Sequence, residues 1–169
     1  MKLARSASSA VASAGATAAL LFALAASPSA SVAQTYVQLA FGGSVSFGAP
    51  TLADLSAGSL EATTPLPFEV VTSSELSGSF TTTVAIRSSS ATLGGGKPVT
   101  SMEWRREDDP TWHALTTTDA IVESRIAQGS PEGHTWGNTI YFRVALSWTG
   151  DPPGTYTGNL VMTVSATQP

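Results

Sequence analysis

The chain has 169 residues, of which 8 are lysine or arginine, 12 are aspartate or glutamate and none is cysteine, so its formal net charge is −4. An acidic chain with so few basic residues lacks the basic face that nucleic acids and anionic membranes require, so we exclude both as partners. Without cysteine the chain forms no disulfide, and a buried core alone must hold the fold.

The beginning of the chain has the layout of a secretory signal peptide. Two basic residues near the start precede an alanine-rich apolar stretch at 18–26, and residues 31–33, Ser-Val-Ala, fit the small-x-small rule for cleavage. The apolar stretch is shorter than the ~20 residues of a membrane span, and no second run of that length occurs, so we expect no transmembrane segment in the mature chain. We therefore expect residues 1–33 to be removed. Residues 34–169 would then be exported as one domain by the general secretory route, to the periplasm, the cell surface or the outside.

The segment after the predicted cleavage site alternates between apolar and polar residues, a period of two that is typical of a β-strand. Its apolar residues are Val37, Leu39 and Phe41 before Gly42-Gly43, and Val45 and Phe47 after it, all at odd positions. Because the two glycines interrupt the run, the pattern predicts either one bent edge strand or two strands that meet at a bulge.

The middle of the chain predicts short strands separated by turns. A period of two recurs at 80–87, 101–106 and 120–125, while the nearest approach to a helix is a short turn of helix within 51–62. Breakers rich in glycine, proline and aspartate separate these segments, and no internal repeat or domain linker is visible. Because short strands with turn chemistry between them build sandwiches and barrels, we predict an all-β fold.

The clearest pattern comes last. Even-numbered apolar residues form one face on each side of Pro153-Gly154: Ile140, Phe142, Val144, Leu146 and Trp148 before it, and Tyr156, Leu160, Met162 and Val164 after it. Pro153 and Gly154 suit the two central positions of a type II turn. We therefore predict a β-hairpin in which the numbers of opposed residues sum to about 304, so that Val144 faces Leu160.

The sequence contains no motif of a catalytic or metal site. Glu103 and Glu123 lie on the polar faces of predicted strands, where carboxylates normally face water. His113 and His134 are the only histidines and have no metal-binding spacing, and no serine stands in a hydrolase motif. We therefore predict that the protein is not an enzyme and has no catalytic residue, metal or cofactor.

The four tryptophans are the remaining candidates for contact with a partner. Trp104 and Trp148 fall on the apolar side of their predicted strands, which favours core packing. Trp112 and Trp136 lie near predicted turns, where exposed rings can stack on sugars or on another protein. The alternative is that these two rings cap the open ends of the fold.

Two stretches of the chain resemble bacterial exported coat and pilus subunits, of which the spore coat protein U-like family is the nearest. The first, FGAPTLADLSAGSLEATTPLPFEVVTSS, begins at Phe47-Gly48, where an early strand ends, and the second is SWTGDPPGTYTGNLVMTVSA. In such subunits a Pro-Gly-Thr-Tyr turn, here at 153–156, leads into an alternating last strand. The chain departs from the pattern because it has no cysteine pair and no aromatic residue near its C-terminus.

The resemblance implies an incomplete immunoglobulin-like antiparallel β-sandwich, which a neighbouring subunit completes by strand addition with its N-terminal extension. Tyr36, Val37, Leu39 and Phe41 would belong to such a donor strand; the alternative is that they form the first strand of their own domain. The leading hypothesis is thus a non-catalytic structural or adhesive surface subunit that associates with identical copies. The second hypothesis is a cell-surface module that binds glycans or proteins through the loop tryptophans.

Overall fold

The computed structural model describes residues 35–41, 44–74, 78–151 and 154–168. The predicted signal peptide and Pro153, and with them the predicted turn, lie outside the described residues. Within them the chain forms ten strands, one short α-helix and one 3₁₀ turn, η1 (Val99–Ser101). No helix of this part is long and apolar enough to cross a membrane.

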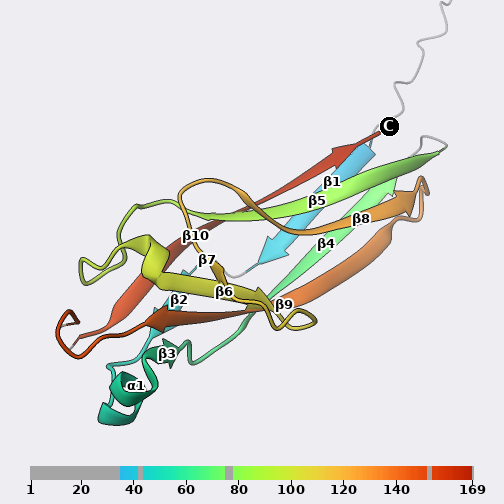
Figure 1. The fold of residues 1–169 in the computed structure, drawn as a ribbon. Coiled ribbons are helices and arrows are strands. Elements are labelled where there is room, and N and C mark those ends of the chain that lie inside the picture. The colour runs from blue at the N-terminus through green and yellow to red at the C-terminus, as the bar shows by residue number, and fades with distance from the viewer. Residues whose placement is uncertain (1–34, 42–43, 75–77, 152–153, 169) are drawn as a thin grey trace, which may run out of the picture. The chain divides into compact units, whose positions relative to one another are not determined.

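The strands form two antiparallel sheets (Figure 1). The first sheet has the spatial order β1 (Thr35–Phe41), β4 (Leu66–Ser74), β9 (His134–Ala145), β6 (Met102–Arg106) and β7 (His113–Ala114), and β3 (Ser59–Glu61) also pairs with β9. The second sheet has the order β2 (Ser44–Phe47), β10 (Tyr156–Thr167), β5 (Ser79–Ser88) and β8 (Ala120–Gln128). One hydrophobic cluster joins residues of both sheets, so the predicted all-β sandwich is confirmed.

The strand order is that of an immunoglobulin-like sandwich. The order β1-β4-β9-β6 corresponds to strands A, B, E and D of that architecture, and the neighbours β10 and β5 correspond to F and C. In the architecture a seventh strand, G, lies beside F. Among the described residues no strand takes this place along the whole length of β10.

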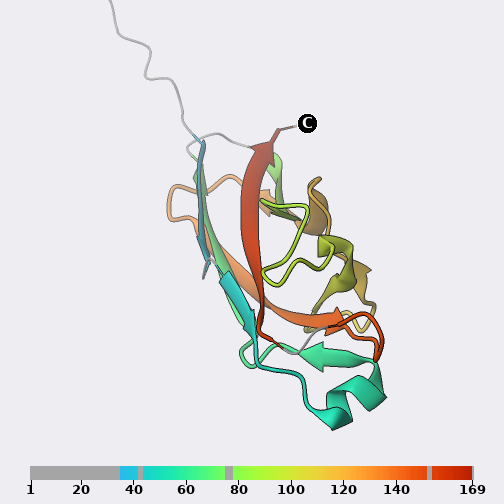
Figure 2. The same ribbon diagram turned by 90° about the vertical axis from the view of Figure 1, so that its left-hand side faces the viewer.

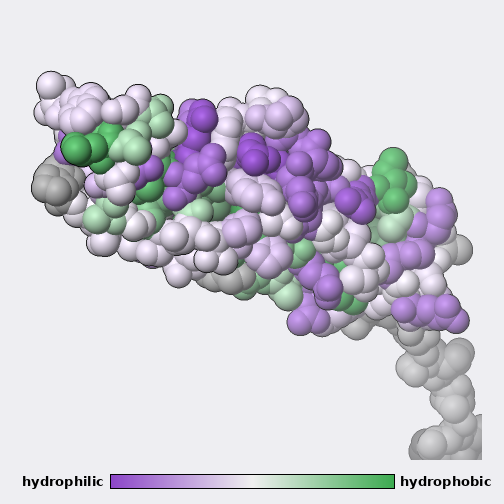
Figure 3. All heavy atoms as spheres, turned by 90° about the horizontal axis from the view of Figure 1, so that it is seen from below, coloured by the Kyte–Doolittle hydropathy of each residue, from purple (hydrophilic) through white to green (hydrophobic). Residues whose placement is uncertain are grey.

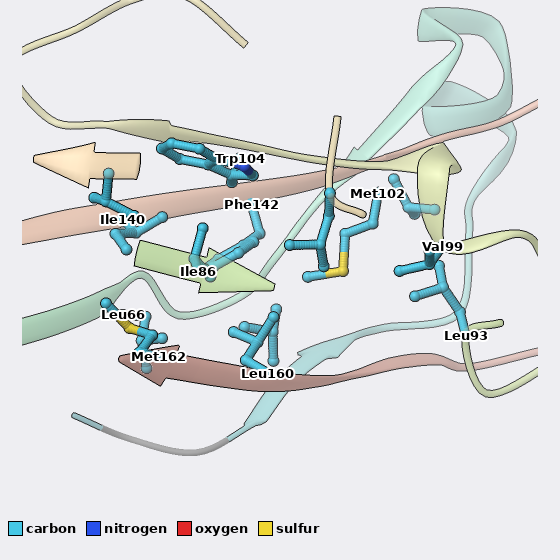
Figure 4. Close-up of a cluster of buried hydrophobic side chains, with 14 of the residues drawn as sticks. Leu66, Ile86, Leu93, Val99, Met102, Trp104, Ile140, Phe142, Leu160 and Met162 are labelled. Atoms are coloured by element: carbon cyan, nitrogen blue, oxygen red, sulfur yellow. The ribbon is translucent and has the colours of Figure 1, made fainter. Parts of the chain in front are cut away.

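Alternate residues of the strands supply the core. In β5 every second residue is buried, and the same alternation runs along β4. Figure 4 shows how Ile86, Phe142 and Leu160 point toward one another from strands of the two sheets. Met102 and Trp104 are buried with them, so the strands predicted at 80–87 and 101–106 and their inward faces are confirmed.

The short helix α1 (Leu52–Ala57) has both of its ends specified by the sequence. The Asp54 N–H donates to Thr51 Oγ1 at 3.2 Å, and the Thr51 N–H donates to the Asp54 carboxylate at 2.8 Å, a capping box. Gly58 ends the helix in the left-handed conformation, with φ 74°. No residue of the helix is buried, and Leu52 is 73% exposed.

The N-terminal alternating segment forms two strands, in different sheets. β1 pairs with β4 in the first sheet, and β2 pairs with β10 in the second. The odd-numbered residues face the core in both, and Val45 and Phe47 are fully buried. The predicted parity therefore holds on both sides of Gly42-Gly43, but the two strands pair in different sheets and do not meet at a bulge within one sheet. Figure 2 shows the two strands, in blue and cyan, one after the other along one side of the domain.

The predicted pairing of the last two strands is wrong. β9 lies between β4 and β6 in the first sheet, whereas β10 lies between β2 and β5 in the second. The inward faces are nevertheless as predicted, with Phe142, Val144 and Leu160 buried. Two strands in opposite sheets point their apolar faces at one core just as two neighbours in one sheet do, so parity alone does not distinguish the two arrangements.

The prediction that Trp148 packs in the core is also wrong. β9 ends at Ala145, so the alternation of the strand no longer directs the side chain three residues later. Trp148 lies in the turn that follows and is 60% exposed, whereas Tyr156, at the start of β10, is buried as predicted.

Candidate functional site

One side of the sandwich is incompletely covered. Residues Leu160–Thr167 of β10 pair with β5 on one side. On the other side β2 pairs only with Tyr156–Asn159, so among the described residues the remainder of that edge has no partner strand. β1, which belongs to the other sheet, runs close to this free edge.

The core is accordingly less well buried along this side. The inward residues of β4 and β5 are buried throughout. By contrast Val37, Leu39 and Phe41 of β1, and Val164 of β10, pack against the core but remain half-buried. Apolar side chains are thus left partly in water between β1 and the free edge of β10, where an added strand would cover them.

The free edge of β10 lacks the features that protect edge strands from pairing. Its sequence, LVMTVSAT, contains no charge and no proline, and neither does the β1 sequence TYVQLAF. The opposite edge of the second sheet, β8, carries an inward-pointing charge at Glu123 and an irregularity in its register opposite Val84 and Ala85. Inward charges and bulges are the usual means by which a sheet edge is blunted, so only one of these two edges is protected.

Glu123 does not face water, which corrects the prediction from its strand pattern. The residue is 9% exposed and accepts hydrogen bonds from Arg125 Nε at 2.6 Å and Asn138 Nδ2 at 3.1 Å. Arg106 Nη1 lies 3.5 Å from its second oxygen. Because Asn138 and Arg106 belong to the first sheet and Glu123 to the second, this network ties the two sheets together beside β8.

Trp112 lies on the outer face of the first sheet and is half-buried. The guanidinium carbons of Arg105 and Arg143 lie 5.2 and 4.4 Å from the centre of its ring. Arg143 is held in turn by Glu103, which accepts a hydrogen bond from its Nε at 2.6 Å. The ring is therefore already stacked on charged side chains of β6 and β9.

Trp136 lies near the start of β9, shortly after the turn at residues 131–132, and its side chain is on the inward face. It pairs with Val70 of β4 on the inward face, meets the ring of Phe68 edge-on at 5.9 Å, and has the Arg125 guanidinium 4.7 Å from its ring centre. Trp112 and Trp136 thus lie on opposite faces of one sheet, and the structure does not bring these two residues together.

The structure brings together one charged pair that the sequence analysis missed. Lys97 donates to the carboxylate of Asp151, and the two side chains are 14% and 4% exposed. Burial acts to raise the pKa of Asp151, but hydrogen bonds from Lys97 and from the Ser147 backbone hold it below its usual value. Burial, together with the charge of Asp151, raises the pKa of the neighbouring Tyr156 phenol.

The histidines do not build a metal site. His113 is exposed, and its ring lies tilted against the Trp104 ring, with 4.9 Å between the ring centres. His134 is the first residue of β9, and the part of β9 that pairs with β6 begins only at Ile140. Within the described ranges no group of three histidine, aspartate or glutamate side chains is placed to hold a metal ion.

Comparison of the chain with protein-family models, with curated proteins and with solved structures finds no match.

Proposed function

We propose that the protein is a non-catalytic, exported structural or adhesive subunit that assembles with copies of itself by strand addition at the free edge of β10. The observation that carries the proposal is the coincidence of three features on one side of the sandwich. There, the edge of β10 lacks a partner strand, the neighbouring core residues are half-buried, and neither β10 nor β1 carries a charge.

An added strand would satisfy both the backbone and the core at this place. Its N–H and C=O groups would pair with Leu160–Thr167, and alternate side chains would enter the space beside Val164. Fully burying a valine, leucine or phenylalanine side chain is worth about 1.5–3 kcal/mol, so completing the burial of several half-buried residues would favour assembly by a few kcal/mol.

The N-terminal segment of a second copy is the donor that fits. Val37, Leu39 and Phe41 alternate with polar residues, so one face of the strand is apolar and the other, with Tyr36, is suited to water. In the isolated domain the same residues form β1 on their own β4. The proposal therefore involves an exchange, in which β1 gives up its pairing with its own β4 and pairs with a neighbour. The gain from assembly is then the difference between the burial of β1 against the neighbour's β10 and its partial burial in its own domain.

Association through the face that Figure 3 shows is the less suitable mode. On the face of the domain shown in Figure 3, hydrophilic side chains spread across the middle and strongly apolar side chains form only small separate patches. Stable association through a face needs a larger continuous apolar area than such patches supply. The edge, which uses backbone pairing, does not need one.

The test is the mass of the mature protein, residues 34–169, in solution as a function of concentration. We expect oligomers by light scattering, and we expect Thr163→Lys, an exposed position on the free edge of β10, to reduce them. The matched control is Ile126→Lys on the protected edge β8, which should leave assembly unchanged. Deleting residues 34–41 should also abolish assembly, and the lysine variant keeps the test valid if that deletion unfolds the domain. A monomer at all concentrations, or equal loss in both lysine variants, would contradict the proposal.

A further inference from the structure

Two loops lie at the end of the sandwich that carries α1 (Figure 1), and they border an open cavity of about 220 Å³. One loop lies between β5 and β6 and the other between β9 and β10. The residues that line the cavity are Gly95, Gly96, Lys97, Pro98, Ser101, Ser147, Gly150 and Asp151. The two loops are far apart in sequence, so the cavity exists only in the folded domain.

The wall of this loop cavity is polar, fixed and without net charge. Lys97 of the first loop donates a hydrogen bond to Asp151 of the second loop, and both residues line the cavity. Asp151 also accepts a hydrogen bond from the Ser147 N–H. Ser147 Oγ accepts from the Gly150 N–H at 3.1 Å, which closes the second loop into a tight turn. An ammonium group has three donors and a carboxylate about four acceptor sites, so both groups keep bonding capacity beyond the pair.

Glycines keep the first loop close to the core and leave the cavity open. Gly95 and Gly96 have φ values of 94° and 84°, which residues other than glycine rarely adopt. A Cβ on Gly95 would lie 3.3 Å from the Tyr156 ring, whereas a Cβ on Gly96 would meet no atom within 4 Å. The loop thus lies on the buried tyrosine and presents open space beside Gly96.

An exposed tryptophan belongs to the same turn. Trp148 lies between the lining residues Ser147 and Gly150 and is 60% exposed. Unlike Trp112 and Trp136, it stacks on no ring or guanidinium group in the part of the chain that the structure describes. A large indole left in water, in the turn whose other residues line the cavity, has no evident role in holding the fold.

We propose that this loop cavity binds one ring of a neutral saccharide, with Trp148 stacking against the sugar at the rim. The volume is about that of seven water molecules at ~30 Å³ each, which suits one small polar ring, and the rest of an oligosaccharide would lie outside the open cavity. Sugar hydroxyls both donate and accept hydrogen bonds, which matches Lys97, Asp151 and Ser101. A charged ligand would have to compete with the Lys97–Asp151 pair, so the balance of charge favours a neutral one.

The test is binding of the mature protein to a panel of neutral hexose oligosaccharides, with uronic-acid oligosaccharides as the charged comparison. We expect retention on at least one neutral member, and a loss of about five- to tenfold in affinity for Trp148→Ala, the size of one aromatic stacking contact. Trp148→Phe should restore most of the affinity. Ser101→Leu, which fills the cavity, should abolish binding.

Controls separate this site from the assembly edge. Leu52→Ala removes another exposed apolar side chain and should leave affinity unchanged, as should Thr163→Lys on β10. Because Trp148 is exposed, Trp148→Ala should not lower the melting temperature. The proposal is wrong if no neutral sugar binds at millimolar concentration, if only the acidic sugars bind, or if Trp148→Ala and wild type bind equally.

Discussion

A substitution at Gly158 tests whether β10 lies in the sheet opposite to β9 and β6. It lies in β10, and a Cβ at this position would be 2.7 Å from Sδ and 3.1 Å from Cε of Met102, which belongs to β6 in the opposite sheet. Met102 is fully buried, and Leu93 lies 3.7 Å from the same point, so the methionine has little room to move (Figure 4). Gly158→Ala should therefore overpack the core at a contact between the two sheets.

The expected cost follows from two opposing effects. Adding a methyl group to a filled core usually costs about 1–3 kcal/mol, while replacing glycine restricts the unfolded chain and returns about 0.4–1 kcal/mol. We therefore expect Gly158→Ala to lower the free energy of unfolding by about 1–2 kcal/mol. Met102→Ala alone should cost about 2–5 kcal/mol through the cavity it leaves, and in that background the added methyl has room. The double variant should be less unstable than the sum of the two by about 1–2 kcal/mol.

Urea denaturation of the mature domain and its three variants measures this coupling directly. Gly48→Ala is the matched control, because no atom lies within 4 Å of the added Cβ, and it should leave stability within about 0.5 kcal/mol of wild type. If Gly158 and Met102 are additive within about 0.5 kcal/mol, the two side chains do not meet and the placement of β10 against β6 is wrong.

Three further substitutions test the polar groups of the interior. Glu123→Ala should lower the free energy of unfolding by about 1.5–3 kcal/mol in urea titrations, the range for hydrogen bonds to a charged group, because Arg125 and Asn138 lose an acceptor while Arg106 and Asn138 keep Asp108. Thr82→Val should raise it by about 0.5–2 kcal/mol, because Thr82 Oγ1 is buried and has no hydrogen-bond partner among the described residues. The fold lowers the pKa of Asp151, so its ionised carboxylate stabilises the fold fully above the unfolded pKa of ~3.9, and this stabilisation is lost as the pH falls through the folded pKa. Asp151→Asn should therefore remove this part of the loss of stability in acid, measured by urea unfolding at pH 2–6.

The strands of this fold could be predicted from the sequence, but their partners could not. A period of two fixes which side chains point inward, and it did so correctly for Phe142 and Leu160. The period carries no information on which strand lies alongside. The last two strands are joined by a short connection that is equally compatible with a hairpin and with a crossing from one sheet to the other.

The error at Glu123 has a different physical cause. A strictly alternating strand would direct Val122 inward and Glu123 outward, yet both are buried. The register of β8 on β5 shifts at this point, since Val84 is opposite Glu123 while the next residue, Ala85, is opposite Ile121. The irregularity turns two consecutive side chains inward, and no residue type in the strand indicates its position in advance.

The candidate sites were harder to predict because they join distant segments. Lys97 and Asp151 are 54 residues apart, and neither stands in a recognisable motif. The one available signal was that Lys97 is the only lysine after residue 33. The exposure of Trp148 depends on where β9 ends, and the ends of elements are what a hydrophobic pattern specifies least well.

The asymmetry of the second sheet determines what kind of assembly the proposed strand exchange would build. Its edge at β8 is blunted by the Glu123 network, and its edge at β10 is open along Leu160–Thr167. Each copy would then offer one acceptor edge and one donor, β1, which are different surfaces. A contact between different surfaces does not close on itself in a pair unless both exchanges occur at once, so its natural product is a linear chain of subunits. We therefore expect electron microscopy of concentrated mature protein to show filaments that shorten as Thr163→Lys protein is mixed in, because each such subunit ends growth at its own acceptor edge. A stable dimer as the only product would contradict the linear chain, because it requires either a symmetric contact or two reciprocal exchanges of β1.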